Sequence, residues 1–352
     1  MAKQEQEATG NAIAIQSQRD TIINQGVSPT DMKTILDALA SQQITYTAVA
    51  REIVDARLFD FEERILRRFA EDNKVRAEAF KDPDFQYLLT RAQHAHARSG
   101  DEDIRDTLVD LIAERSKQTD RNRLALSLNQ AVEKAALLTK NEFAELSVSY
   151  LYRYTLNHTV NNFQKLTEYL STSTAPFLND LSREESSFSY IESQGCGTVS
   201  ITSMTLRDII AANYGGLISK GWDEEAFSSL VTQYGLLPFA NNPQVFRSCL
   251  QDASKKQANA VRKDVFEEVG RAAGMTPEQI TGVWTNFEAT MMSRDELVAA
   301  LEPLFTSAGK LFSLWDETPL KSLLLTSVGI AIAHANSVRV AGFDADLSIW
   351  IK

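Results

Sequence analysis

Hydrophobic residues recur every three or four positions along most of this chain, which is the spacing of an amphipathic α-helix. The pattern is clear over residues 45–72, where Val49, Ile53, Ile65 and Phe69 keep that spacing within a densely charged stretch. Charged residues between them are expected to face water. The sequence therefore predicts a mainly α-helical protein.

Capping residues and prolines mark where several of these helices begin. Ser28 and Pro29 open the first one, and Asp82 with Pro83 repeats the device. A short polar side chain bonds the free N–H groups of the first turn, and proline suits its first position. The predicted helices cover residues 28–40, 45–72, 84–97, 101–118, 122–136, 142–156, 184–192, 206–213, 223–233, 243–253, 256–273, 277–291 and 320–340, with one more after a capping box at 293–296. Residues 198–201 form either a short strand or an extended link.

The two ends of the chain show a different pattern, with period two. Ile13 and Ile15 alternate with small residues near the start, Ile22 follows a polar stretch, and Leu347, Ile349 and Ile351 alternate at the end. Period two is typical of a half-buried strand, whose backbone groups need a partner. We therefore predict that the terminal strands pair with each other, or with another copy of the chain.

A stretch of small polar residues at 171–176 divides the helical pattern into two halves. A chain of 352 residues is long enough for two hydrophobic cores. The predicted fold is two helical subdomains tied by a small β-sheet from the N- and C-terminal strands. Its parts are a strand segment at 1–27, helical subdomains at 28–172 and 173–345, and a terminal strand at 346–352.

Composition limits the partners and cofactors of this chain. Its net charge of −11 argues against duplex DNA or an anionic membrane as a partner. Cys196 and Cys249 are far apart and lack zinc-ligand spacing, and the turn around Cys196 is expected to be structural rather than nucleophilic. Gly215 and Gly216 match no phosphate-loop or dinucleotide motif, so neither a metal nor another cofactor is expected. The polar N-terminus has no apolar signal segment, which indicates the cytoplasm.

Arg153 and His158 form the one short motif with catalytic chemistry. Their spacing resembles the arginine–histidine motif of HEPN-type ribonucleases, in which the two residues act on RNA phosphates, usually across a dimer. Such a histidine would transfer protons while the guanidinium stabilises the phosphorane. A separation of five positions places them about 140° apart around a helix, so they converge only if the helix bends or ends between them. The alternative is a surface or capping arginine and a helix-end histidine.

An acidic stripe recurs at helical spacing farther towards the N-terminus. It consists of Asp103, Asp106, Asp110 and Glu114. One helix presents a line of carboxylates, whereas a divalent metal needs ligands from several directions. The stripe is therefore predicted to be a solvated face paired with Arg105 and nearby cations, without a metal.

Several segments carry a resemblance to a known family over nearly the whole chain. They are the opening strand, residues 80–87, 151–155, 195–197, 325–336 and 349–351. Together they resemble an uncharacterised bacterial family of similar length. Similar opening segments occur on bacterial proteins suspected of roles in phage defence, so the resemblance implies a defence-related or mobile-element context. It implies no catalytic residues.

The function that these observations favour is a non-catalytic oligomeric interaction or assembly protein, as a component of bacterial phage defence. Its expected partners are other copies of the chain and a second protein. The alternative is an HEPN-like ribonuclease that uses Arg153 and His158. A third hypothesis is a conditional membrane effector that uses the apolar helix at 320–340, although its apolar centre falls short of the roughly 20 residues that span a membrane.

Overall fold

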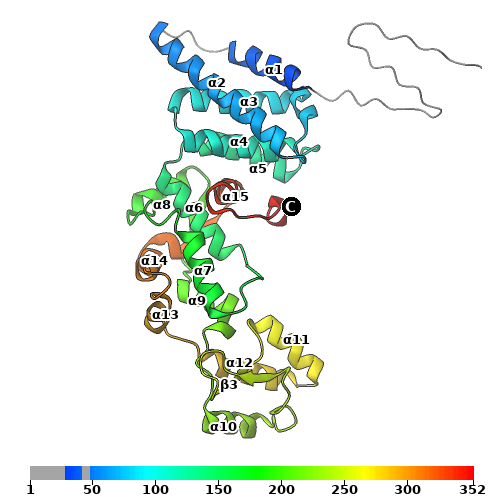
Figure 1. Cartoon of the computed structure of the whole chain (residues 1–352), viewed down its shortest axis with the longest axis vertical. Helices are drawn as coiled ribbons and strands as arrows, with labels where there is room; N and C mark the ends of the chain where they lie inside the picture. The colour runs from blue at the N-terminus through cyan, green and yellow to red at the C-terminus, as the bar shows by residue number, and fades with distance from the viewer. Residues whose placement is uncertain (1–27, 42–47) are drawn as a thin grey trace, which may run out of the picture.

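The computed structural model describes residues 28–41 and 48–352 of the chain. Within these ranges the protein consists of α-helices joined by loops, with two small antiparallel sheets, so the prediction of a mainly α-helical fold is confirmed. Figure 1 shows an elongated molecule in which the helices stack in three tiers along the long axis.

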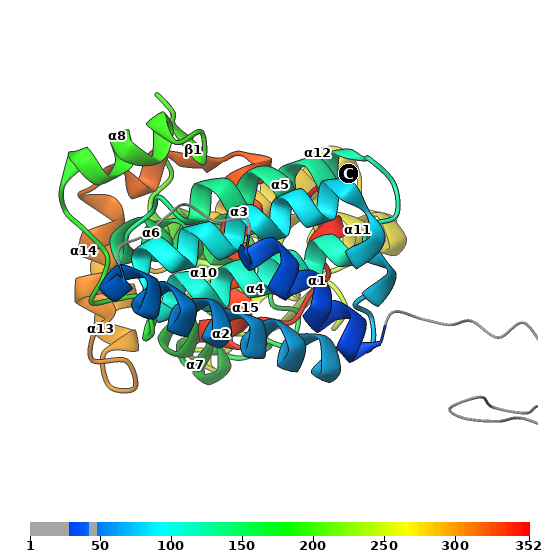
Figure 2. The same ribbon diagram turned by 90° about the horizontal axis from the view of Figure 1, so that it is seen from above.

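The first tier is the N-terminal helical array. It contains α1 (Pro29–Ser41), α2 (Ala48–Glu71), the 3-10 helix η1 (Ala77–Lys81), α3 (Pro83–Ser99), α4 (Glu102–Ser116) and α5 (Arg123–Ala135). The predicted cap at Asp82 is confirmed, because its side chain accepts a hydrogen bond from Asp84 N. Asp101 caps the next helix by accepting one from Ile104 N. Seen along the long axis, α2, α3 and α5 lie near one another (Figure 2), and α3 contacts both of the others.

The second and third tiers hold the rest of the chain. The second contains α6 (Lys140–Arg153), α7 (Phe163–Thr174), α8 (Glu185–Ser193), α9 (Leu206–Tyr214), α13 (Arg294–Leu301), α14 (Ala308–Asp316), the 3-10 helix η3 (Pro319–Ser322) and α15 (Ser327–Ala341). The third contains α10 (Glu224–Tyr234), α11 (Lys263–Ala273) and α12 (Pro277–Glu288), with the 3-10 helix η2 (Gly215–Leu217) leading into it. Of the two small sheets, one joins segments that are far apart in sequence, and the other joins two consecutive strands.

Helix α15 lies at the centre of the molecule and brings the end of the chain back to the first half. Every residue from Val328 to Ser337 is buried, and the helix packs against α4, α5 and α6. A side chain on Gly329 would overlap the carbonyl oxygen of Cys196, so glycine allows the close approach. One apolar cluster runs through helices from both halves. The predicted division at residues 172 and 173 falls within α7 and stays a prediction.

Each sheet has two strands. Strand β1 (Gly197–Val199) pairs antiparallel with β4 (Leu323–Leu325), with Thr198 opposite Leu324. Strand β2 (Phe246–Ser248) pairs antiparallel with β3 (Lys256–Ala258). Of the two predictions for residues 198–201, the short strand is thus the observed one, although it begins at Gly197 and ends at Val199.

The predicted C-terminal strand is wrong. Residues Leu347–Ile349 form a 3-10 helix, η4, because the Asp346 side chain accepts a hydrogen bond from Ser348 N and caps a turn. Leu347 and Ile351 are 1% and 3% exposed whereas Ile349 is 58% exposed, so the buried positions are four residues apart rather than two. The proposed N-terminal partner, with Ile13, Ile15 and Ile22, lies outside the described residues.

Three other expectations differ from the structure. Residues 243–253 contain β2 and a turn instead of a helix, because the Asp252 side chain accepts a hydrogen bond from Ser254 N and the chain reverses into β3. The helix expected at 256–273 begins only at Lys263. The one expected at 320–340 is interrupted by β4 and begins again after the Thr326 cap. Among the described residues, no helix combines the length and the hydropathy needed to cross a membrane.

Candidate functional site

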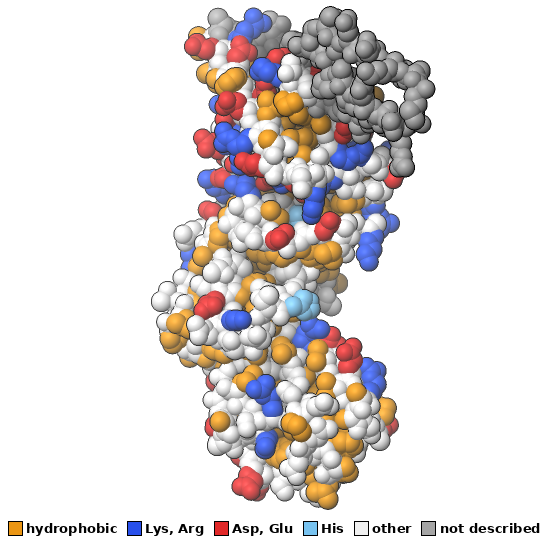
Figure 3. Space-filling model, turned by 45° about the vertical axis from the view of Figure 1, so that its right-hand side comes forward, with side chains coloured by type: hydrophobic (Ala, Val, Ile, Leu, Met, Phe, Trp, Pro, Cys, Tyr) orange, Lys and Arg blue, Asp and Glu red, His pale blue; other side chains and the backbone are white. Residues whose placement is uncertain are grey.

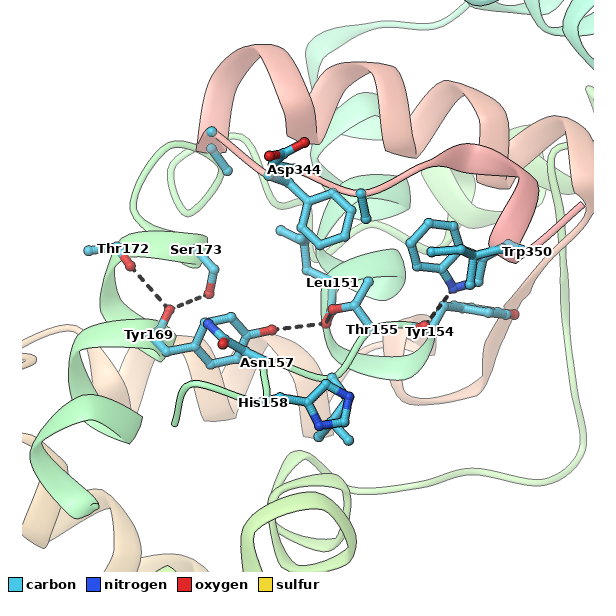
Figure 4. A pocket seen from close by; sticks show the side chains of 16 residues that line it. Leu151, Tyr154, Thr155, Asn157, His158, Tyr169, Thr172, Ser173, Asp344 and Trp350 are labelled. Atoms are coloured by element: carbon cyan, nitrogen blue, oxygen red, sulfur yellow. Dashed lines mark hydrogen bonds between the residues drawn. The ribbon is translucent and has the colours of Figure 1, made fainter. Parts of the chain in front are cut away.

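A cavity of about 580 Å³ lies where the end of α6, α7 and the last residues of the chain meet (Figure 4). We call it the tail pocket. Its walls are Leu151, residues 154–158, three residues of α7, and residues of the segment 341–350. Its volume is in the range of roughly 300–1,000 Å³ that is typical of ligand sites.

The first wall is the loop that follows α6. The helix ends at Arg153, and the Thr155 hydroxyl donates a hydrogen bond to Leu151 O at 2.6 Å. The Tyr169 hydroxyl of α7 donates to the same carbonyl at 3.2 Å (Figure 4). Asn157 N donates to the Tyr214 hydroxyl of α9 at 2.9 Å. Side chains from two other helices therefore hold this loop in place.

The second wall is the C-terminal segment after α15. Gly342 ends that helix with a φ of 65°, a left-handed conformation that favours glycine. His334 Nε2 lies 2.7 Å from Ala345 O, and because a carbonyl can only accept, the ring proton is on Nε2. Trp350 Nε1 donates to Tyr154 O at 2.7 Å and joins the end of the chain to the end of α6 (Figure 4).

The rings around this wall pack edge to face on a buried tyrosine. Tyr150 has ring-centroid distances of 5.6 Å to Phe343 and 5.1 Å to Trp350. Such aromatic pairs add to the stabilisation from burial. Burial also raises the pKa of the Tyr150 hydroxyl, which has no hydrogen-bond partner among the described residues. The C-terminal wall is thus a packed part of the core rather than a loose tail.

The lining of the tail pocket is aromatic and carries one carboxylate. The rings are those of Tyr154, Tyr169, Phe343 and Trp350. Asp344 and His158 lie on opposite sides of the pocket in the view of Figure 4. The described lining residues include no lysine or arginine. The pocket is therefore suited to an apolar group that carries positive charge.

The structure does not place Arg153 and His158 in one site. The guanidinium of Arg153 donates a hydrogen bond to Lys321 O and lies over the Trp315 ring, 5.3 Å from its centroid. Burial lowers the pKa of Arg153. His158 is exposed, in the loop beyond the helix, and lines the tail pocket, whereas Arg153 does not. The ribonuclease hypothesis stays a prediction, without support from this geometry.

Comparison with protein-family models places this chain in a family. A protein-family model, described as ":-like", matches residues 26–351. This chain belongs to that family. The match confirms the predicted resemblance to an uncharacterised family over nearly the whole length, whereas bacterial origin and phage defence stay predictions. Neither the comparison with curated proteins nor that with solved structures found a match.

The acidic stripe of α4 is paired with cations from several helices. Arg105 Nε lies 2.9 Å from Asp106 Oδ1, so the predicted pairing with Arg105 is confirmed. The other pairs are Asp103 with Arg339 and Lys140, Asp106 with Arg64, Asp110 with Arg68, and Glu114 with Lys117. Figure 3 shows basic and acidic side chains interleaved over the first tier. No group of three or more His, Cys, Asp and Glu residues converges as a metal site within the described ranges. That the stripe binds no metal remains to be measured.

The two cysteines are buried and unpaired. Burial raises the pKa of the Cys196 thiol to about 11, which keeps it protonated at neutral pH. Cys249 Sγ lies 3.3 Å from Ser219 O and donates to it. Both are in the environment of structural rather than nucleophilic thiols.

A buried pair of carboxyl groups was not predicted from the sequence. Glu142 and Glu145 of α6 are 5% and 0% exposed. Ser187 Oγ of α8 lies 2.8 Å from Glu142 Oε1 and 2.7 Å from Glu145 Oε2. A hydroxyl has one proton, so a protonated Glu145 donates to Ser187, which donates to Glu142. Burial raises the pKa of Glu145 to about 8, and the charge of Glu142 acts in the same direction. The only sequence signal was the capping box of Thr139 and Glu142, which explains one of the two acids.

Proposed function

We propose that this protein is a non-catalytic interaction protein that assembles with copies of itself and holds a basic segment of a second protein in the tail pocket. The lining of that pocket carries the proposal. Aromatic rings attract organic cations through their negative faces, and a nearby carboxylate adds charge complementarity. Asp344, which lines the pocket together with Phe343 and Trp350, supplies that carboxylate.

A protein segment fits the pocket better than a fully enclosed small molecule. The C-terminal wall is partly open to solvent, and Ile349 on that wall is 58% exposed. An apolar residue next to the bound cation can cover Ile349 and exclude water from the contact. The volume of about 580 Å³ leaves room for an arginine or lysine side chain with part of its backbone.

The arrangement around His158 supports a role without catalysis. A ribonuclease needs the histidine and a cation at the same phosphate. His158 lines the tail pocket, while the Arg153 guanidinium is held by the Lys321 carbonyl and the Trp315 ring. The pocket therefore offers recognition rather than a matched acid and base.

Self-association is supported by the segment 199–204, which begins at the last residue of β1 and exposes three apolar side chains. Val199 and Met204 are 37% and 41% exposed, and Ile201 is fully exposed. Neighbouring apolar side chains that remain in water are typical of contact surfaces between proteins. A role of this assembly in bacterial phage defence is the context that the resemblance implies, and we expect the assembly to act in the cytoplasm.

Titration with short peptides tests the proposal. We expect the peptide Ac-Leu-Arg-Leu-NH2 to bind saturably and to shift the ring resonances of His158, one of four histidines in the chain. Asp344→Asn should weaken binding roughly threefold to tenfold, because it removes one charge-assisted contact. Asp37→Asn, which removes the same charge from the exposed face of α1, should leave the affinity unchanged.

Two results would contradict the proposal. One is equal binding of Ac-Leu-Glu-Leu-NH2, because an aromatic pocket with a carboxylate disfavours an anion. The other is binding of tetramethylammonium alone with no binding of the basic peptide, which would make the pocket a small-cation site. Folding of each variant is checked by its near-UV circular dichroism.

A further inference from the structure

A second cavity lies in the first tier, between helices α3 and α5, and differs in charge from the rest of the protein. It has a volume of about 510 Å³. We call it the α3–α5 groove. Arg91, His94 and Arg98 line it from α3, at the spacing that places residues on one face of a helix. Glu133 and Lys134 line it from α5. Figure 2 shows the two helices next to each other.

The groove has a surplus of positive charge. Its one lining carboxylate, Glu133, is 3.8 Å from Arg91 Nε, which is a long ion pair. Among the described residues, neither Arg98 nor Lys134 has a carboxylate oxygen within 4.0 Å. Three cations and one anion leave a charge of about +2, in a chain with a net charge of −11. The surplus is therefore local and concentrated.

These cations are not needed to complete the end of α3. Helix C-termini have free carbonyl groups that often attract basic side chains. Here Arg57 of α2 fills that role: its Nη1 donates to Ala97 O at 2.8 Å and to Arg98 O at 3.1 Å. The guanidinium of Arg98 is thus left to face the groove.

His94 supplies an uncharged donor in the same wall. Its Nε2 is shielded from solvent and has no hydrogen-bond partner among the described residues. A shielded polar atom without a partner costs free energy, which a bound ligand can recover. Burial lowers the pKa of His94, and the charge of Arg91 lowers it further, so the ring stays neutral and keeps one N–H to donate.

We propose that the α3–α5 groove binds a small molecule that carries a phosphate group, held by Arg98, Lys134 and Arg91 with His94 as a neutral donor. Guanidinium groups match phosphate oxygens in pairs, and the lysine adds a point charge. The volume accommodates a phosphate together with an attached organic group of nucleotide size. This site is separate from the tail pocket and does not depend on the function proposed for it.

Calorimetric titration with sodium pyrophosphate, at constant ionic strength, tests the proposal. We expect one saturable site and a shift of a single histidine side chain among the four in nitrogen-15 spectra, assigned with His94→Gln. The double variant Arg98→Gln, Lys134→Gln should bind at least about tenfold more weakly, because it removes two charge-assisted contacts. Both side chains are on the surface of the groove, so the variant should fold.

The matched control removes two cations from α11 in the third tier. In Lys263→Gln, Arg271→Gln the net charge changes by the same amount, and both residues are exposed. We expect its pyrophosphate affinity to equal that of the unmodified protein. If the two double variants lose pyrophosphate affinity equally, the attraction is non-specific and the proposal is overturned. A lack of saturable binding, or a histidine shift that persists in His94→Gln, would also overturn it.

Discussion

Glu145 holds a proton under conditions in which an exposed glutamate has lost it. Its side chain is fully buried against Ser187, and burial raises its pKa from 4.5 to about 8. Between these two pH values the unfolded chain releases this proton while the folded chain keeps it. Stability therefore falls as the pH rises from about 4.5 to 8 and changes no further above that window.

Glu145→Gln should remove this dependence on pH. A glutamine keeps a donor for Ser187 and has no charge to bury. We expect the free energy of unfolding of the variant, relative to the unmodified protein, to rise by roughly 1 kcal/mol per pH unit between pH 5 and 8. Urea titrations at four pH values measure it.

The neighbouring exposed acid gives the control. Glu185→Gln on α8 removes one carboxylate at the surface and should change stability equally at each pH. If the Glu145→Gln difference is also flat across the window, Glu145 is ionised in the folded protein and the shared-proton arrangement is wrong.

At the scale of elements, the C-terminal turn shows how one pattern allows two structures. A run of apolar residues at every second position also contains pairs that are four positions apart. Leu347 and Ile351 therefore suit one side of a helical turn as well as one face of a strand. The Asp346 cap and the hydrogen bond from Trp350 to Tyr154 decide in favour of the turn. Tyr154 lies 196 positions before Trp350, so the period of the local sequence does not reveal this contact.

Substitutions at Leu347 and Ile349 separate the two structures. In a half-buried strand both side chains would be on the same buried face, and truncating either one would lower the free energy of unfolding substantially. In η4 we expect Leu347→Ala to lower the free energy of unfolding by about 2–4 kcal/mol, because it leaves a cavity. Ile349→Ala should cost less than about 1 kcal/mol, since its side chain is 58% exposed. If chemical denaturation shows that the two substitutions lower the free energy of unfolding by similar amounts, the strand is favoured.

Most helices could be predicted because their capping residues and the helical spacing of their apolar residues lie within short stretches of sequence. Helices begin within one residue of the predicted starts at 84, 101 and 277, and their caps are Asp82, Asp101 and Thr276. These local signals failed at residues 171–176, where the small polar residues are typical of a linker. Part of this stretch is helical, because the hydroxyl groups of Ser173 and Thr174 in α7 donate hydrogen bonds to carbonyls four residues earlier in the same helix. Likewise, β2 and β3 depend on pairing between segments that single-chain periodicity does not reveal.

The tail pocket was only partly predictable for the same reason. His158 was identified in the sequence, but as the partner of Arg153, which the fold turns towards Trp315. The other walls come from α7 and from the segment after α15. That segment lies well over a hundred residues beyond His158 in sequence. A site built by such distant segments has no local motif.

At the scale of the whole molecule, the exposed segment 199–204 makes a prediction about assembly. We expect Ile201→Asp to reduce self-association at least about tenfold in sedimentation equilibrium, because a charge in an apolar contact is costly to bury. Ile201 is fully exposed in the single chain, so the variant should keep its fold. Leu237→Asp places the same charge at an exposed leucine elsewhere, beyond α10, and should leave the mass unchanged. An identical mass distribution for all three proteins would rule out this surface.

The central position of α15 also sets the order in which the chain can fold. Asn336 of this helix donates a hydrogen bond to Ser147 of α6 across 189 positions of sequence, and β4 next to it completes the sheet with β1. Contacts so distant along the chain are slow to form because a long loop must close first. During synthesis, α4, α5 and α6 emerge long before the helix that covers them. The growing chain therefore keeps an apolar surface open to water and to chaperones until α15 itself has been synthesised.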